Sequence, residues 1–247
     1  MTPISGVPRL DPILRPPINQ PTGVPMFKPL LAFVSLCLMT AMMAANPPFV
    51  RGMPLSTPYA FTAIDEHTHP AVGKMTVTGL PYCTIELIDE DTAVTAAHCV
   101  GQLGEEVWFA GVKYQVDRID ILPEADMALY TLCEEPPIEP LHISLVPASF
   151  GDPVVIVGNG GFIRKQSNPG ALYVTGCYAD KPMFIMLYTG HATCWPGDSG
   201  GALLRNGKLI GIMNFLRTIN NEVVDNGCSS ILYSLAWMEA HGYDPRF

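Results

Sequence analysis

Gly197-Asp198-Ser199-Gly200-Gly201 sets one serine among three glycines in the last fifth of a 247-residue chain. Glycines let the backbone turn sharply, so that a serine hydroxyl and the neighbouring N–H groups can be exposed together. A hydroxyl beside converging N–H donors is the arrangement that acyl transfer requires. Ser199 is therefore a candidate nucleophile, which needs a general base from elsewhere in the chain.

A histidine and an aspartate that could complete such a site both precede the serine. His98 lies in Thr-Ala-Ala-His-Cys, residues 95–99, and Asp126 begins the run Asp-Met-Ala-Leu-Tyr-Thr-Leu, residues 126–132. The α/β-hydrolases share Gly-x-Ser-x-Gly but place the acid and the histidine after the serine. Only His241 follows Ser199 here, so the order His, Asp, Ser argues against that fold.

These three blocks, in this order, resemble the signature blocks of the trypsin-like (chymotrypsin-family) serine peptidases. The resemblance covers residues 70–240 and is closest to compact bacterial streptogrisin-like members, which have a similar Pro-Gly-Asp-Ser-Gly-Gly form. It implies that Ser199 attacks the scissile carbonyl, that His98 accepts and returns the proton, and that Asp126 orients the imidazole. The N–H groups of Gly197 and Ser199 would then form the oxyanion hole.

The composition limits the classes of partner. Lys and Arg number 14 against 23 Asp and Glu, a net charge of −9, which is the wrong balance for binding phosphate backbones, so no nucleic acid is expected. The expected partners are protein or peptide substrates, and the chain is expected to be a monomer. His67, His69 and His191 lack the spacing of metal ligands, so we expect no metal and no cofactor.

Many short apolar segments, typical of strands, fill residues 73–216. Asn206-Gly207 between two apolar runs predicts a hairpin, and only residues 232–242 have helical spacing, with Leu232, Leu235, Ala236 and Met238 as one apolar stripe. With the resemblance, the expected fold is all-β: two antiparallel six-stranded β-barrels of the chymotrypsin type with a short C-terminal helix. The first barrel, carrying His and Asp, is expected over residues 70–141 and the second, carrying Ser, over 142–247.

The segment before the barrels is predicted to direct export. Residues 1–28 are rich in proline and are expected to be disordered, and residues 47–69 form a linker. Between them lie residues 29–46, in which the 17 residues from Pro29 to Ala45 are apolar or small and carry no charge. This segment predicts a signal peptide, if translation starts at Met26, or a signal anchor. Either places the catalytic part outside the cytoplasm, secreted or membrane-anchored, with membrane contact only through this segment if it is uncleaved.

The seven cysteines divide into one within the apolar N-terminal run, Cys37, and six beyond it. The resemblance implies a Cys83–Cys99 disulfide that closes the histidine loop. It also implies a Cys194–Cys228 disulfide that links two walls of the substrate pocket. The pairing of Cys133 and Cys177 stays open.

The resemblance also suggests how substrate is bound. Asn214, Phe215 and Leu216 would pair with the substrate backbone as an added strand. Ala192 or Thr193 would form the base of the pocket, and neither carries the charge that would hold Lys or Arg. We therefore expect small or medium apolar side chains, with Leu216 and Ile231 as walls, rather than basic ones. Recognition of an acidic side chain by His191 is an alternative.

Asp198 is expected to need a cation. Animal members of the family supply it with a new N-terminus, typically Ile-Val-Gly-Gly, a sequence that does not occur in residues 46–83. Arg164 is our hypothesis for an internal partner, by analogy with bacterial members, and would make proteolytic activation unnecessary.

The predicted function is that of a serine endopeptidase acting through a Ser-His-Asp triad and an acyl-enzyme. A catalytically silent binding protein on the same fold is the alternative from another class. A self-processing capsid or polyprotein-type protease is a third possibility, suggested by the proline-rich prefix.

Overall fold

The computed structural model describes residues 61–102, 104–178, 181–188, 194–219 and 222–245, which belong to one unit, Leu55–Phe247. The predictions for the proline-rich prefix, the membrane-directed segment, His191, Ala192 and Thr193 lie outside these residues. No helix within the described ranges is long and apolar enough to cross a membrane.

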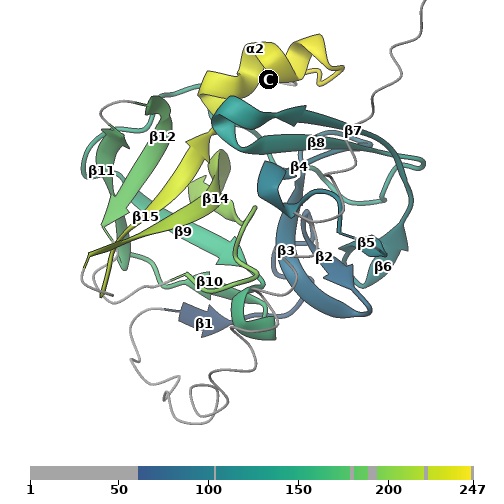
Figure 1. Ribbon diagram of the computed structural model, residues 1–247, viewed down its shortest axis with the longest axis horizontal. Helices are drawn as coiled ribbons and strands as arrows, with labels where there is room; N and C mark the ends of the chain where they lie inside the picture. Colours follow the sequence, from purple (N-terminus) through teal and green to yellow (C-terminus); the bar gives the residue numbers. More distant parts are fainter. Residues whose placement is uncertain (1–60, 103, 179–180, 189–193, 220–221, 246–247) are drawn as a thin grey trace, which may run out of the picture. The chain divides into compact units, whose positions relative to one another are not determined.

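The first sheet is a curled antiparallel sheet that contains the histidine and aspartate blocks (Figure 1). Its strand order is β6-β5-β2-β3-β4-β8-β7 in the described part of the chain. The two ends of this order, β6 and β7, are separated only by Gln115, so one stretch of chain lies at both edges and the sheet curls back on itself. The strands are β2 (Val72–Val77), β3 (Leu80–Leu87), β4 (Thr92–Ala96), β5 (Glu105–Phe109), β6 (Val112–Tyr114), β7 (Val116–Leu122) and β8 (Met127–Leu132).

The second sheet is also antiparallel, in the order β1-β10-β9-β11-β12-β15-β14-β13, and β13 pairs with β9 as well. That pairing closes a ring of β9, β11, β12, β15, β14 and β13, the expected six strands, to which β10 and β1 are added. The strands are β1 (Phe61–Ala63), β9 (Pro153–Gly158), β10 (Lys165–Ser167), β11 (Leu172–Tyr178), β12 (Lys181–Tyr188), β13 (Ala202–Arg205), β14 (Lys208–Ile219) and β15 (Glu222–Ser230).

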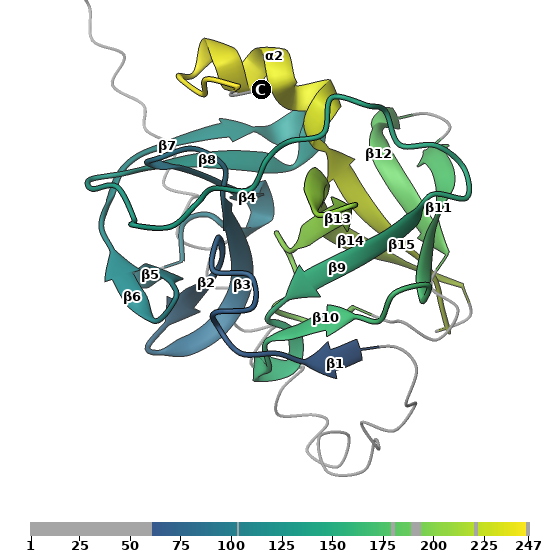
Figure 2. The same ribbon diagram turned by 180° about the vertical axis from the view of Figure 1, so that it is seen from behind.

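The predicted all-β fold with two curled antiparallel sheets and a C-terminal helix is confirmed. Within the described ranges the first sheet has seven strands where six were expected, because the chain is interrupted at Gln115 between β6 and β7, and the start of the second sheet also differs. Residues 61–63, expected to be linker, form β1 and pair with β10. The helices in the described residues are short: η1 (Ala97–Cys99), η2 (Pro123–Ala125), η3 (Gly160–Phe162) and α2 (Ile231–Ala240). Figures 1 and 2 show the two sheets side by side, with α2 at one end and β1 with β10 at the other.

The alternation of side chains along β8 explains why the aspartate block is so apolar. Ala128, Tyr130 and Leu132 lie in the interior of the first barrel. Met127 and Leu129 lie in the apolar interface between the two barrels, which we call the seam. Since successive side chains of a strand point to opposite faces, both faces of β8 are buried. β13 does the same in the second barrel, with Leu203 inside and Ala202 and Leu204 in the seam.

Helix α2 covers one end of the seam, but through a different face from the predicted one. Its buried residues are Ile231, Ser234 and Met238, and Leu235 packs partly buried against the same core. This is an i, i+3, i+4, i+7 stripe that starts one residue earlier than predicted. Leu232 is only half-buried and Ala236 is exposed, so of the expected stripe only Leu235 and Met238 face the core.

Candidate active site

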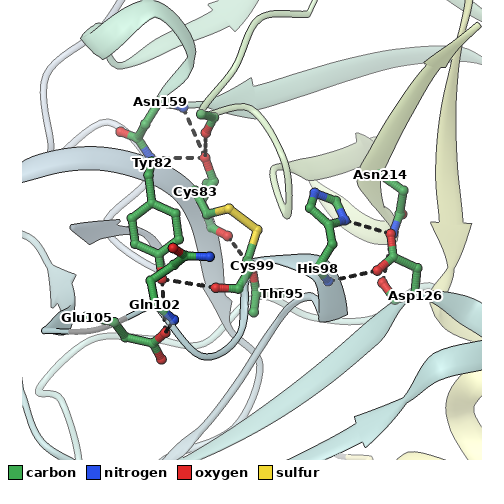
Figure 3. Close-up of a disulfide and its surroundings, with 12 residues drawn as sticks. Tyr82, Cys83, Thr95, His98, Cys99, Gln102, Glu105, Asp126, Asn159 and Asn214 are labelled. Atoms are coloured by element: carbon green, nitrogen blue, oxygen red, sulfur yellow. Dashed lines mark hydrogen bonds and ion pairs between the residues drawn. A yellow bond between two sulfur atoms is a disulfide. The ribbon is translucent and has the colours of Figure 1, made fainter. Parts of the chain in front are cut away.

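His98 and Asp126 meet at the seam, because η1 carries the histidine and the aspartate directly follows η2. His98 Nδ1 lies 2.7 Å from Asp126 Oδ2, and the His98 backbone N–H donates to Asp126 Oδ1 at 2.9 Å. The Ala97 N–H donates to the Asp126 carbonyl at 3.0 Å. Figure 3 shows the imidazole and the carboxylate side by side. Backbone and side-chain contacts together therefore orient the ring with Nδ1 toward the acid.

Asn214 is a third member of this hydrogen-bonded chain. Its Nδ2 donates to Asp126 Oδ2 at 2.9 Å and to the Asp126 carbonyl at 2.7 Å, while its Oδ1 accepts the Ser229 N–H at 2.7 Å. The register of β14 against β15 shifts between Met213 and Phe215, and such a bulge can re-aim a side chain. The residue expected to contact substrate thus bonds the aspartate, as Figure 3 shows. A polar residue within an apolar strand was the one available signal.

The surroundings of Asp126 keep it ionised. Burial alone raises the pKa of this carboxyl, but hydrogen bonds from His98 and Asn214 outweigh it, so the pKa lies below the usual value. Asp126 also has a left-handed backbone, with φ 48° and ψ 50°. This conformation is uncommon for a residue other than glycine and is found at sites that the surrounding structure constrains.

The serine loop of the second barrel is fixed against β3 of the first. The Thr84 N–H donates to the Ser199 carbonyl at 2.8 Å, and Thr84 Oγ1 donates to the Gly197 carbonyl at 2.8 Å. Gly200 has φ +80°, and a Cβ there would lie 2.1 Å from the Thr84 carbonyl oxygen, so no other residue fits. The loop therefore crosses the seam by close backbone contact.

Two N–H groups of this loop are free to act as donors. Among the described residues, neither the Gly197 N–H nor the Ser199 N–H donates a hydrogen bond, although Gly197 is buried. Gly197 has φ +99°, the positive range that favours glycine. Within the same residues no hydrogen bond joins the Ser199 hydroxyl to the His98 ring, a contact that often tightens only when substrate binds.

The cation beside Asp198 is Lys165, and the prediction of Arg164 is wrong. Lys165 Nζ lies 2.9 Å from Asp198 Oδ2. The Arg164 guanidinium instead donates to the carbonyls of His69 at 2.5 Å, Val72 at 2.6 Å and Asp65 at 3.1 Å. Adjacent side chains of an extended segment point in opposite directions, so only one of the two cations can face Asp198.

The Asp198 carboxylate is fully buried and fully bonded. Its Oδ1 accepts the Gly160 N–H at 2.7 Å, and its Oδ2 accepts the Trp195 N–H at 2.7 Å as well as the Lys165 ammonium. A Cβ on Gly158 or Gly160 would come within 2.5 or 2.3 Å of a carboxylate oxygen. These glycines therefore provide the space into which the carboxylate fits.

One of the two predicted disulfides forms. The Cys83–Cys99 bridge joins β3 to η1 beside His98, with the Cα atoms 6.2 Å apart (Figure 3). Cys194 and Cys228 are free, buried thiols, so the predicted pocket-wall disulfide is absent. Cys228 Sγ packs 3.8 Å from Met213 Sδ in the interior of the second barrel. Burial there raises the pKa of the Cys194 and Cys228 thiols.

The sequence left the pairing of two other cysteines, Cys133 and Cys177, open. Cys133 is an exposed free thiol at the end of β8. The side chain of Cys177 lies outside the described part of the structure, as does that of Leu216.

The backbone of the predicted substrate strand is described as far as Ile219. Phe215 pairs with Gly227 and Leu216 with Asn226, and a Cβ on Gly227 would lie 2.2 Å from the Phe215 ring. The Phe215 ring thus covers Gly227, its partner on the neighbouring strand β15. A cleft of about 620 Å³ lies elsewhere, lined by residues 142–146 with Arg205 and Tyr243, and no predicted site residue borders it.

Comparisons with known proteins agree with this geometry. A family model described as a trypsin-like peptidase domain matches residues 83–212, more than half of the chain, and this range contains His98, Asp126 and Ser199. Two peptidases from strains of Corynebacterium glutamicum are each 24% identical over 208 residues, which cover 77% of this chain and 74% of theirs. One of them is described only as an uncharacterized peptidase.

The fold has a solved counterpart. Mouse neuropsin, a serine protease expressed in the limbic system of the brain, matches with a TM-score of 0.64 and 16% identity, over 74% of this chain and 98% of that one. At this identity the match shows the fold alone. The family model, which covers more than half of the chain, shows that the chain belongs to the trypsin-like peptidase family.

Proposed function

We propose that the chain is a serine endopeptidase that hydrolyses peptide bonds through Ser199, His98 and Asp126 and an acyl-enzyme intermediate. The observation that carries this proposal is the His98–Asp126 contact beside a loop that presents Ser199 together with two free N–H donors. Catalysis of acyl transfer needs a nucleophile, an oriented base and an oxyanion site in one place.

The chemistry follows from which atoms are occupied. His98 Nδ1 is held by Asp126, so Nε2 is the nitrogen that takes the Ser199 proton as Oγ bonds to the scissile carbonyl carbon. The oxyanion that forms would accept the N–H groups of Gly197 and Ser199. Collapse breaks the C–N bond, and His98 returns the proton to the leaving amine. Water, deprotonated by the same imidazole, then releases the acyl group and restores Ser199.

Specificity and location are part of this proposal. The substrates are proteins or peptides that are cut after small or medium apolar residues rather than basic ones, because no charged residue of the sequence is predicted at the pocket base. The catalytic body works outside the cytoplasm as a monomer, secreted or held by its N-terminal segment. The Cys83–Cys99 bridge supports this location, since disulfides persist in oxidising compartments.

The function can be tested with a fluorophosphonate probe, which reacts covalently with an activated serine. The folded, disulfide-bonded full chain should be labelled, and Ser199→Ala should abolish labelling. Ser149→Ala is the matched control, because Ser149 is exposed in a loop and should leave labelling unchanged. A wild-type chain that is folded but not labelled would contradict the proposal and favour a silent binding protein on the same fold.

A further inference from the structure

Glu105, the first residue of β5, accepts four hydrogen bonds, and Figure 3 shows its carboxylate near Tyr82 and Gln102. Its Oε1 accepts the Tyr130 hydroxyl at 2.7 Å. Its Oε2 accepts the Tyr82 hydroxyl at 3.0 Å and the backbone N–H groups of Gly101 at 3.1 Å and Gln102 at 3.3 Å. A carboxylate that accepts this many hydrogen bonds holds the donor groups in place, because hydrogen bonds to a carboxylate are stronger than those between neutral groups.

The four donors come from the three segments that build the histidine side of the site. Tyr82 lies on β3, next to the disulfide residue Cys83, and its hydroxyl is also 3.1 Å from the Cys99 carbonyl. Tyr130 lies on β8, four residues after Asp126. Gly101 and Gln102 lie in the loop that leaves η1, three and four residues after His98. One carboxylate therefore joins both strands to the backbone that follows the histidine.

The two phenols are suited to remain donors. Burial raises the pKa of both Tyr82 and Tyr130 well above the usual value, and the hydrogen bond to Glu105 and its negative charge add to this effect. Tyr130 is fully buried in the first core. Both hydroxyls therefore stay protonated beside the carboxylate.

Helix η1 depends on such anchors because a single 3₁₀ turn is too short to hold its own orientation. On its N-terminal side the Ala97 N–H bonds the Asp126 carbonyl. On its C-terminal side the disulfide fixes Cys99, and the backbone that continues from it is bonded by Glu105. We propose that Glu105 is a positioning residue for His98, which holds η1 so that the imidazole meets both Asp126 and Ser199. This inference rests on the proposed function.

The neighbouring acid provides a matched control within the same strand. Glu106 points to the other face of β5, where it bonds Lys113 at 2.7 Å and Thr76 at 3.1 Å, and none of its described contacts reaches the histidine loop. Glu106→Gln therefore removes an equal charge at nearly the same place without touching η1.

The test measures labelling by the fluorophosphonate probe as a maximal rate, kinact, and a half-saturating concentration, KI. Glu105→Ala should lower kinact by about 30- to 100-fold with KI unchanged, since a misplacement of about 1 Å can cost on the order of 100-fold. Glu105→Gln keeps acceptor atoms for some of the four donors and should recover part of the loss. Glu106→Gln should stay within about 2-fold of wild type, because its ion pair with Lys113 is exposed and none of its described contacts reaches η1.

Two further measurements separate positioning from stability and from the proposed function. Leu132→Val, a conservative change in the same core, should lower the melting temperature without changing kinact. Hydrogen exchange at the Gly101 and Gln102 amides should accelerate in Glu105→Ala but not in Glu106→Gln or Leu132→Val. Absence of labelling in wild type would refute the proposed serine peptidase function. In that case the hydrogen-exchange result alone would decide whether Glu105 holds the loop after η1. Unchanged exchange, or a kinact that follows melting temperature in all variants, would overturn the role of Glu105.

Discussion

The two halves of the site are held in place by different means. On the histidine side, His98 and Asp126 keep 44% and 30% of their side chains exposed, and their loop is tied by a disulfide and by hydrogen bonds to Glu105. On the serine side, Asp198 and Lys165 are 1% and 11% exposed, and the loop is fixed by close packing around glycines. The more exposed histidine side is therefore held by a covalent cross-link and hydrogen bonds, whereas the buried serine side is held by close packing and an ion pair. Changes to the two halves should therefore fail in different ways.

Replacement of the buried cation should have the largest effect. Lys165→Met leaves Asp198 as an unpaired buried charge, which should lower the free energy of unfolding by about 3–5 kcal/mol and abolish probe labelling. Chemical denaturation and labelling of the full chain measure both effects. Arg164→Met removes bonds to three carbonyls and should cost less, about 1–3 kcal/mol.

Lys208→Met is the control, because Lys208 is exposed on β14 of the same barrel. Equal losses for Lys165→Met and Lys208→Met would show that Asp198 does not depend on the ion pair. A loss of labelling in Arg164→Met alone would return the role to Arg164.

Removal of the disulfide tests the cross-linked half. The Cys83→Ser, Cys99→Ser double variant opens a loop of 16 residues and should lose about 3 kcal/mol of stability. Thermal melting with and without a thiol reductant measures this. Reductant should lower the melting temperature of wild type but not of the double variant, because Cys194 and Cys228 are free thiols. A further decrease in the double variant would reveal a second bridge, which would contradict the structure if it joined Cys194 to Cys228.

The difference between the halves also decides what the sequence could predict. His98 and Asp126 lie in short blocks whose local order carries the information, and the family resemblance of those blocks implied the Cys83–Cys99 bridge, which the structure contains. Lys165 could not be distinguished from Arg164, because the choice depends on which of two adjacent side chains at the start of β10 points toward Asp198. Asn214 was assigned to the substrate because the bulge that turns it toward Asp126 arises from the register of β14 against β15.

Glu86 provides a contrast to Asp198, since it is also a carboxyl buried in the described structure but has no hydrogen-bond partner on either oxygen. Burial raises the pKa of Glu86 well above its usual value, and the nearby Arg164 offsets this only in part. The folded state therefore binds a proton that the unfolded state releases above about pH 4.3. Stability from this group is complete below that pH and is lost as the pH rises toward the folded pKa, by at most about 1.4 kcal/mol per pH unit.

Glu86→Gln should remove this dependence and make the chain more stable than wild type at pH 8. Free energies of unfolding at pH 5, 6.5 and 8 measure it, with the exposed Glu124→Gln as control. Parallel pH curves for wild type and Glu86→Gln would show that Glu86 is not protonated in the fold.

Asn214 connects the two halves, because it reaches from β14 of the second barrel to Asp126 of the first. Asn214→Ala removes two donors from Asp126 and should lower kinact roughly 10-fold, the equivalent of about 1.4 kcal/mol. It should also raise the pKa of Asp126, since the Asn214 hydrogen bond lowers that pKa, so that labelling is lost at a higher pH on acidification. Asn214→Ser retains one donor and should recover part of the rate. Asn168→Ala, in a loop of the second barrel, should change neither the rate nor the pH profile, and the same result for Asn214→Ala would mean that the histidine half is complete without its bond to the second barrel.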